Sequence, residues 1–227
     1  MSDKREIKSY VLRTGRMTPG QTRALDELWP TYGLDPAGEL LDWTTIFGRD
    51  APCVLDIGFG NGDSLASMAA ANPDKNYIGA EVHAPGVGHC LLLASKQELT
   101  NLKVVRQDAV EVLKNSVADF SLARVNIFFP DPWHKKRHHK RRLVQPNFIK
   151  LLAKKLQPTG MLHIVTDWPN YAEHIDTVIS ANSDFEYLSA APDDRVTTRF
   201  DNRGARLGHS NWERAWCTCS KISTHEK

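Results

Sequence analysis

The feature that most constrains the fold of this chain is an alternation of short apolar runs with segments of helical pattern. The apolar runs have the length of strands and lie at 54–57, 77–82, 102–106, 123–129 and 161–166. The helical segments lie at about 64–71, 86–99, 109–114, 146–156 and 169–181. Neighbouring parallel strands need a crossover connection, which is usually a helix. The pattern therefore predicts an α/β fold, a mostly parallel, doubly wound sheet with helices on both faces.

The two ends of the chain depart from this alternation. Residues 1–23 carry six basic and two acidic side chains, and we expect Gly15, Pro19 and Gly20 to interrupt any helix there. We therefore expect a mobile basic arm over residues 1–23 and a single domain over residues 24–227. Two short helices are expected at about 23–29 and 38–47, and two further strands at 185–189 and 212–220. The expected sheet thus has seven strands.

Charge and cysteine content exclude several classes of protein. The net charge is only +2 with a pI near 8.3, so any site for a polyanion has to be local. The four cysteines are too few and too irregularly spaced for a disulfide framework, and they include no Cys-x-x-Cys zinc spacing. No signal peptide and no apolar run of membrane length stands out. We expect a cytoplasmic protein in a reducing compartment, with no membrane contact.

A glycine-rich turn, Gly58-Phe59-Gly60-Asn61-Gly62, follows the first strand of the alternation. A dinucleotide site would have a third glycine where this chain has Asp63, and an acid at the start of a helix would repel a pyrophosphate. A ligand that carries a sulfonium and an ammonium group, but no phosphate, would tolerate the acid. S-adenosyl-L-methionine meets these requirements, with the backbone at Gly58 and Gly60 approaching it closely.

Acidic residues occur at the ends of three successive strands. Asp56 lies at the end of the strand before the glycine turn, Glu81 closes the second strand and Asp108 closes the third. Glu81 is placed to accept from both ribose hydroxyls of such a ligand, and Asp108 from an adenine amine. Each acid alone is equally well explained as a helix cap or a loop carboxylate. Three in register beside a glycine turn favour a cofactor site.

The fourth strand is followed by Asp131-Pro132-Trp133 and then by nine consecutive basic residues at 134–142, called here the basic segment. An isolated basic run is usually a solvated loop or a localisation signal. Here six fixed positive charges adjoin one acid at the end of a strand, which favours a nucleic acid substrate. The candidates for contacts to the RNA backbone are Lys136, Arg137, Lys140, Arg141 and Arg142.

The acid in this segment, Asp131, is the candidate catalytic residue. A ring nitrogen such as guanine N7 has a free lone pair at neutral pH, so it attacks a sulfonium methyl group without losing a proton. Such a reaction needs alignment of the reacting atoms and negative charge near a base that becomes cationic. Asp131 would supply that charge, and Lys135 would anchor a phosphate or meet guanine O6.

The chain resembles the tRNA (guanine-N7)-methyltransferases over nearly its whole length. The motifs that carry the resemblance are Phe128-Phe129-Pro130-Asp131-Pro132-Trp133-His134-Lys135, Lys140-Arg141-Arg142, Asp56-Ile57-Gly58-Phe59-Gly60, Gly79-Ala80-Glu81-Val82-His83, Asp108-Ala109, Thr166-Asp167-Trp168 and Arg206-Leu207-Gly208-His209. The resemblance implies a Rossmann-like class I methyltransferase fold whose last strand is antiparallel. It also implies that the chain methylates the guanine at position 46 in the variable loop of tRNA, its partner.

The resemblance also implies roles for individual residues. S-adenosyl-L-methionine would be bound by Asp56, Glu81, Asp108 and Asp131, and the substrate by Lys135, Asp167 and the segment Thr198, Arg199, Phe200 and Asp201. The family commonly has Glu at the positions of Asp56 and Asp201, so the reach of these two acids is shorter by one methylene. Asp167 is equally well placed to cap the helix that follows it.

The sequence leaves several alternatives open. Four arginines in the loop near the end of the chain either follow the RNA backbone or solvate an exposed loop: Arg195, Arg199, Arg203 and Arg206. A non-catalytic RNA-binding module would explain the basic residues, but it has no use for three acids around a glycine turn. A nicotinamide oxidoreductase would explain the turn, but Asp63 argues against it. The nine histidines show no metal-binding spacing, so no metal is expected.

Overall fold

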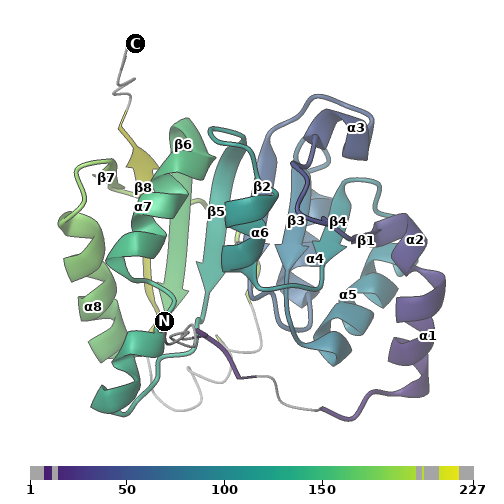
Figure 1. The fold of residues 1–227 in the computed structure, drawn as a ribbon, viewed down its shortest axis with the longest axis horizontal. Coiled ribbons are helices and arrows are strands. Elements are labelled where there is room, and N and C mark those ends of the chain that lie inside the picture. Colours follow the sequence, from purple (N-terminus) through teal and green to yellow (C-terminus); the bar gives the residue numbers. More distant parts are fainter. Residues whose placement is uncertain (1–7, 12–14, 198–200, 202–209, 220–227) are drawn as a thin grey trace, which may run out of the picture.

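A single eight-stranded sheet runs through the computed structural model, which describes residues 8–11, 15–197, 201 and 210–219. The strand order is β1-β4-β3-β2-β5-β6-β8-β7 (Figure 1). The strands are β1 Gly33–Leu34, β2 Cys53–Ile57, β3 Asn76–Ala80, β4 Leu102–Val105, β5 Leu122–Phe128, β6 Leu156–Thr166, β7 Phe185–Leu188 and β8 Trp212–Thr218. Every pair from β1 to β6 is parallel, and β8 is antiparallel to both β6 and β7. The predicted α/β class and the antiparallel last strand are confirmed.

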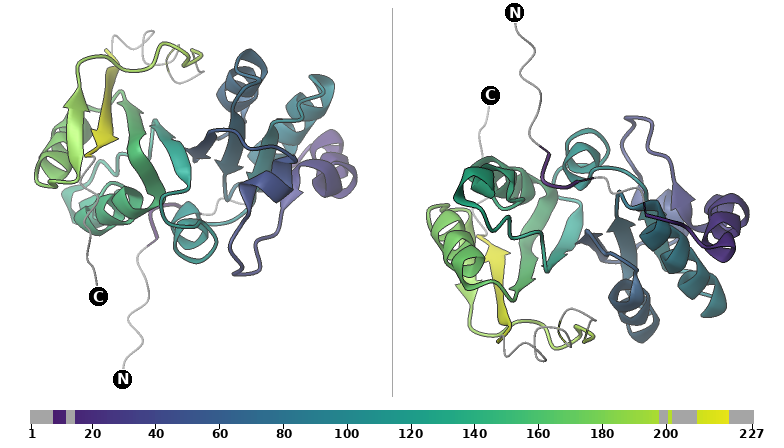
Figure 2. Two further views of the ribbon diagram at one scale, coloured as in Figure 1. Left: turned by 90° about the horizontal axis from the view of Figure 1, so that it is seen from above. Right: turned by 90° about the horizontal axis from the view of Figure 1, so that it is seen from below.

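Helices cover both faces of this sheet, as the two views in Figure 2 show. The helices are α1 Pro19–Glu27, α2 Trp29–Tyr32, α3 Trp43–Phe47, α4 Asp63–Ala71, α5 Ala84–Lys96, α6 Ala109–Asn115, the 3-10 helix η1 Lys136–Arg141, α7 Pro146–Lys155 and α8 Pro169–Ser180. Buried side chains of α6, α7 and α8 form one apolar core with the sheet, and those of α1, α4 and α5 form a second. Strands with a core on each side need apolar residues at nearly every position, which explains the continuous apolar runs in the sequence.

The sheet has eight strands, so the predicted count of seven is wrong by one. The additional strand is β1, which pairs two residues with Val104 and Val105 of β4 at the edge of the sheet. Its sequence, Gly33-Leu34, is too short to show the alternation that marks a strand. All seven predicted strands are present, with ends that differ by a few residues.

The N-terminal region begins its first helix earlier than expected. Pro19 and Gly20 do not interrupt a helix, because α1 begins at Pro19, inside the expected arm. Proline fits the first position of a helix, where its missing N–H is not needed. Thr18 and Gln21 form a capping box, in which the Thr18 hydroxyl accepts from the Gln21 N–H at 3.2 Å. The helix packs on α5, so residues 19–23 are part of the helical layer on that face of the sheet.

The strand order fixes where a ligand can bind. From β2 the chain moves outward through β3 and β4, and then returns across the sheet to β5 on the other side of β2. The connections that leave β2 and β5 therefore diverge, one through α4 and the other through the basic segment. Open α/β sheets bind ligands outside the carboxyl ends of the strands at such a switch point. The acids at the predicted strand ends are brought to this edge.

Candidate functional site

A cavity of about 260 Å³ lies at this edge, where β2, β3, β4 and β5 end; it is called here the strand-end cavity. Its walls bring together five of the six residues that were predicted to bind the cofactor: Gly58, Gly60, Glu81, Asp108 and Asp131. They come from four different strand ends, so only the folded sheet makes them neighbours. Asp56 is not among the residues that line the cavity.

The glycine turn after β2 forms one wall of the strand-end cavity. Gly58 has φ of 72° and Gly60 has φ of 62°, in the left-handed region that glycine adopts without strain. A Cβ atom on either residue would meet no atom within 4 Å, so their backbone faces open space. Gly62, by contrast, packs so closely on α5 that a Cβ atom would lie 2.5 Å from Cys90. The turn is thus fixed to α5 at one end and leaves its backbone accessible at the other.

Glu81 is held in place by backbone amides. Its carboxylate accepts from the N–H groups of Gly60 at 3.0 Å, Val82 at 2.7 Å and His83 at 2.9 Å. The bond from Gly60 joins the end of β3 to the glycine turn after β2. A carboxylate accepts about four hydrogen bonds, so Glu81 retains capacity for a ligand hydroxyl.

Asp108 has two roles at once. Its Oδ1 atom caps α6 by accepting from the Val110 N–H at 3.0 Å, and its Oδ2 atom lies 3.2 Å from Nζ of Lys8. A role as a helix cap and a place in the strand-end cavity are therefore compatible for this residue. Its sequence neighbours gave no sign of the Lys8 contact, because 100 residues separate the two.

Asp131 lies exposed at the mouth of the strand-end cavity, on the loop that leaves β5. The loop is sharply bent, because Phe129 with φ of 51° and Trp133 with φ of 49° are both in the left-handed region. Non-glycine residues in this region are strained and occur often at functional sites. The Phe129 N–H donates to the Val165 carbonyl at 2.8 Å and fixes one end of the bend. Asp131 is thus presented on a fixed turn.

Asp56 lies within β2 and is 2% exposed. Burial raises the pKa of its carboxyl to about 7; the nearby Arg124 opposes this shift, and Glu81 adds to it. The sequence placed Asp56 at the lip of the strand, but Ile57 is the last residue of β2 and lines the cavity in its place. The role of Asp56 in cofactor binding stays a prediction.

Residues 8–11, called here the N-terminal strap, lie against the cavity. Trp133 Nε1 donates to the Ser9 carbonyl at 3.0 Å, and Arg141 donates to the carbonyls of Lys8 at 3.1 Å and Tyr10 at 3.0 Å. The Arg141 guanidinium also stacks on the Trp133 ring, 4.1 Å from its centroid. Ser9 and Tyr10 form part of the wall of the strand-end cavity. Sequence reasoning missed this strap, because carbonyl acceptors leave no trace in residue types.

The basic segment divides into two groups with different environments. Lys135, Lys136 and Lys140 are exposed, and no ion pair with another described residue is found for them. Arg142 is 2% exposed and donates to the Pro132 carbonyl at 3.0 Å and to Asn170 Oδ1 at 2.7 Å. The guanidinium of Arg142 is thus used inside the protein, and its contact with the RNA backbone stays a prediction.

The predicted substrate residues near the end of the chain are only partly described. Thr198, Arg199 and Phe200 lie outside the described residues, as do Arg203 and Arg206. Asp201 is buried and accepts two hydrogen bonds from Arg195, at 2.8 and 2.9 Å. The Arg195 guanidinium is therefore paired inside the protein and does not simply solvate the loop, while its contact with the RNA backbone stays a prediction.

Arg195 also donates to Glu213 at 3.0 Å, and Glu213 in turn contacts His163 Nε2 at 2.8 Å. Burial opposes the ionisation of Glu213, but the hydrogen bonds and charges of His163 and Arg195 outweigh it and hold its pKa below the usual value. This network ties the segment of Asp201 to β6 and β8. No pattern in the sequence indicated the roles of His163 and Glu213.

Asp167 follows β6 at the same edge of the sheet. It does not cap α8, since the N-cap residue is Trp168 and makes no side-chain cap hydrogen bond. That alternative is wrong, and a substrate role for Asp167 stays a prediction. Lys135 directly precedes η1 on the exposed loop after Asp131, and its substrate role stays a prediction.

Comparison with known proteins decides the family. A family model described as "Putative methyltransferase" matches residues 50–214. A tRNA (guanine-N(7)-)-methyltransferase of Shewanella amazonensis is 54% identical over 92% of this chain and 90% of its own length. The protein of the same name from Alcanivorax borkumensis is 53% identical over the same shares. The chain belongs to the tRNA (guanine-N7)-methyltransferase family.

Solved structures agree with this family at the level of the fold. A 16S rRNA (adenine(1408)-N(1))-methyltransferase from Catenulisporales acidiphilia superposes with a TM-score of 0.55 at 14% identity, over 84% of this chain and 94% of that one. The 16S rRNA methyltransferase KamB gives a TM-score of 0.54 at 14% identity, over 80% and 94%. The class I fold expected for a tRNA (guanine-N7)-methyltransferase is therefore confirmed.

Within the described part of the chain, no helix is both long enough and apolar enough to span a bilayer. The same residues contain no group of three or more His, Cys, Asp or Glu side chains arranged to hold a metal ion.

Proposed function

We propose that this protein transfers the methyl group of S-adenosyl-L-methionine to N7 of guanine 46 in the variable loop of tRNA. The observation that carries the proposal is the joint placement of Glu81, Asp108 and Asp131 around one cavity at the switch point. Membership of a family whose relatives have this activity in their names supports it. Because the substrate is tRNA, we place the enzyme in the cytoplasm.

The residues around the strand-end cavity fit this cofactor. Gly58 and Gly60 leave open space beside their backbone, and Glu81 retains acceptor capacity for ribose hydroxyls. The acids give the cavity a negative potential that suits a sulfonium and an ammonium group. The volume of about 260 Å³ lies just below the usual range of about 300–1,000 Å³ for ligand pockets, and the N-terminal strap narrows it.

The cofactor supplies an electrophilic methyl group on a positively charged sulfur. The guanine N7 lone pair forms the new C–N bond while the C–S bond breaks, so the base gains the positive charge and no proton is transferred. Asp131 stabilises the base as it becomes cationic, and the bent loop from Phe129 to Trp133 holds it in place. Lys135 binds a phosphate or guanine O6 beside it.

The test is incubation with methyl-labelled S-adenosyl-L-methionine and unmodified tRNA, followed by nucleoside analysis. We expect label in 7-methylguanosine from position 46. The matched control is the same tRNA with 7-deazaguanosine at position 46, which keeps the base-pairing face but has a C–H group in place of N7. Label in the 7-deaza tRNA, or on an exocyclic amine, would overturn the assignment.

The two rival classes are separated by cofactor titration. An RNA-binding module would bind tRNA but not S-adenosyl-L-methionine, and an oxidoreductase would bind a nicotinamide dinucleotide. The structure argues against the oxidoreductase, because α4 begins at Asp63 with its acid in the first turn, where a pyrophosphate would have to lie. Calorimetry on one preparation with S-adenosyl-L-methionine and with a nicotinamide dinucleotide therefore distinguishes the three classes. We propose no metal and no obligatory protein partner.

A further inference from the structure

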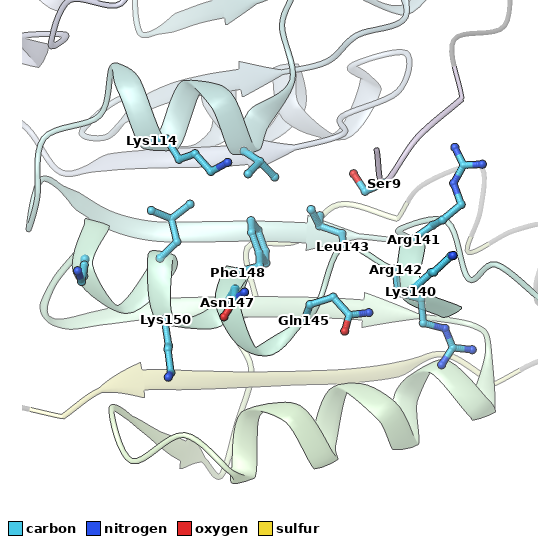
Figure 3. Close-up of a pocket in the computed structure, with 13 residues that line it drawn as sticks. Ser9, Lys114, Lys140, Arg141, Arg142, Leu143, Gln145, Asn147, Phe148 and Lys150 are labelled. Atoms are coloured by element: carbon cyan, nitrogen blue, oxygen red, sulfur yellow. The ribbon is translucent and has the colours of Figure 1, made fainter. Parts of the chain in front are cut away.

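A second hollow, of about 610 Å³, lies between α6 and α7 beside the strand-end cavity, and it is called here the α6–α7 groove (Figure 3). Lys114 lies toward one end with Lys150, and Lys140 and Arg141 lie toward the other. Lys154 is the fifth cationic residue that lines it without being buried, and no acidic residue is among its described lining residues. A groove with one sign of charge selects an anionic partner.

Two of the three lysines of α7, Lys150 and Lys154, make no side-chain hydrogen bond or ion pair with another described residue. Lys150 and Lys154 lie one turn apart on the exposed side of α7, whose opposite side is buried through Phe148 and Leu152. Their neighbour Lys155 is a useful contrast, because it is buried and donates to the Val117 carbonyl at 2.8 Å and to Asp119 at 2.7 Å. One lysine of α7 thus stabilises the fold, and two point outward.

This arrangement of charge is unfavourable without a partner. Like charges four residues apart on a helix destabilise it by about 0.2–0.5 kcal/mol, and Lys114 on α6 adds a third positive charge to the same groove. Lys114 does contact Glu111 of its own helix at 3.3 Å, but this is an exposed pair, and such pairs contribute little. A bound polyanion would remove the repulsion.

The groove also continues into the proposed active site. Ser9 and Leu143 line both the α6–α7 groove and the strand-end cavity. Lys140, an exposed lysine of the basic segment on η1, also lines the groove. A chain of phosphates that places its base at Asp131 would therefore meet positive charge at both ends of the groove, near η1 and near the end of α7.

We propose that the α6–α7 groove binds the phosphodiester backbone of the tRNA, through Lys114, Lys150 and Lys154, as an extension of the basic segment. The inference rests on the proposed function, since it uses the strand-end cavity as the place of the methylated base. An anionic membrane surface is disfavoured, because membrane-binding faces insert large apolar side chains, and none of the exposed large hydrophobic residues lines this groove.

The experiment replaces one charge at a time. Lys114→Gln, Lys150→Gln, Lys154→Gln and the triple variant are compared with Lys96→Gln, an exposed lysine on α5 at the opposite face of the sheet. Affinity for unmodified tRNA is measured from about 0.1 to 0.5 M salt. Each lost phosphate contact should lower the magnitude of the slope of log affinity against log salt by about 0.7, so the slope of the triple variant should be smaller by about 2. Near physiological salt the triple variant should bind tRNA about 10- to 50-fold more weakly.

Additional measurements separate a binding role from other effects. The affinity for S-adenosyl-L-methionine and the single-turnover rate at saturating tRNA should be unchanged in the triple variant. Its melting temperature should not fall, because exposed like charges are removed. A salt slope equal to that of Lys96→Gln would overturn the proposal. Loss of binding to phosphatidylglycerol vesicles, with tRNA binding intact, would overturn it in favour of a membrane.

Failure of this inference is distinguishable from failure of the proposed function. If the wild-type protein binds tRNA through these lysines but labels no 7-methylguanosine, the proposed role of the groove is supported and the proposed activity is overturned. If it labels guanine 46 and the triple variant has the same salt slope as Lys96→Gln, the proposed activity is supported and the proposed role of the groove is overturned. Nuclease footprinting of bound tRNA gives an independent readout, since protection lost in the triple variant has to form one continuous stretch of backbone.

Discussion

The cofactor side and the RNA side of this protein are built in different ways. On the cofactor side, Glu81 accepts three backbone N–H groups and Asp108 accepts one, so both carboxylates are oriented before any ligand arrives. On the side proposed to bind RNA, Lys135, Lys136 and Lys140 are exposed, so we expect the partner to set the geometry of their side chains. Binding on the cofactor side thus depends on the positions of the acceptor atoms, and binding on the RNA side depends on the number of positive charges.

This difference decides which experiment is informative on each side. Preorganised dipoles and charges act through geometry in a partly dry site, so a substitution that keeps shape and removes charge isolates their effect. Exposed cations act through release of counterions from the RNA, so the salt dependence of binding counts them. Asp131 lies between the two sides, and it provides the most demanding test of the comparison.

The largest effect is expected for Asp131→Asn. This change keeps the shape of the side chain and removes the charge that would stabilise the cationic base. The single-turnover methylation rate should fall by about 10- to 1,000-fold, or about 1.4–4 kcal/mol, while tRNA affinity stays nearly constant. Rapid-quench measurement with labelled cofactor gives the rate.

Full activity of Asp131→Asn under single turnover would show that Asp131 belongs to the exposed side, with no electrostatic role. A second measurement uses pH. Because N7 carries a free lone pair, the wild-type rate should not rise steeply with pH, as it would if a general base had to take a proton from the acceptor.

Asp56 is the exception on the cofactor side, since burial raises its pKa to about 7. Between the unfolded value of 3.8 and about 7, only the unfolded state loses the proton, so stability is lost as the pH rises through this interval. Asp56→Asn removes this loss of stability, because the asparagine amide does not titrate. The variant should gain about 2–3 kcal/mol relative to wild type between pH 5 and pH 8.

Denaturant unfolding at each pH measures this difference. Asp42→Asn is the control, because Asp42 is an exposed helix cap whose pKa is lowered by hydrogen bonds from Thr45. Its stabilising effect is complete above the unfolded value, so the difference between Asp42→Asn and wild type should be flat from pH 5 to pH 8. A flat difference for Asp56→Asn as well would mean that Asp56 is already ionised at pH 5.

For Glu81→Ala we expect a loss of cofactor affinity of about 1.5–3 kcal/mol, the usual cost of losing hydrogen bonds to a charged group. Part of this loss has a structural origin, because Gly60 also donates to Glu81. Glu81→Gln separates the parts, since the amide oxygen still accepts from the turn but the charge is gone. Calorimetry with S-adenosyl-L-methionine on folded variants measures both, and unchanged affinity in Glu81→Ala would contradict the ribose assignment.

The sequence predicted that the acids at the strand ends lie together, because strand ends and glycine turns are local signals. Apolar runs locate the strands, and parallel pairing then brings Glu81, Asp108 and Asp131 to one edge without knowledge of any contact. The conformations of Gly58 and Gly60 follow from the same local turn. Nothing beyond the order of elements was needed.

What the sequence could not show depends on contacts between distant segments. The guanidinium groups of Arg141 and Arg142 are adjacent in a run of basic residues, yet one holds the N-terminal strap and the other is buried against Asn170. Their partners are mostly backbone carbonyls, which every residue has. The ion pair of Asp201 with Arg195 likewise could not be read from the sequence, because residue types alone do not say which charged side chains of a loop meet.

The smallest effect is expected at the N-terminal strap, where Lys8 contacts the carboxylate of Asp108 that would receive the adenine amine. The Lys8 side chain is 40% exposed, and exposed ion pairs contribute about 0.2–1 kcal/mol. If the cofactor has to displace Lys8, Lys8→Met should raise the affinity for S-adenosyl-L-methionine by about 1.5- to 5-fold, with a smaller gain at high salt. Lys96→Met on α5 is the matched control and should leave the affinity unchanged. Weaker cofactor binding by Lys8→Met would mean that Lys8 helps to hold the bound cofactor. The strap would then belong to the cofactor side of the protein.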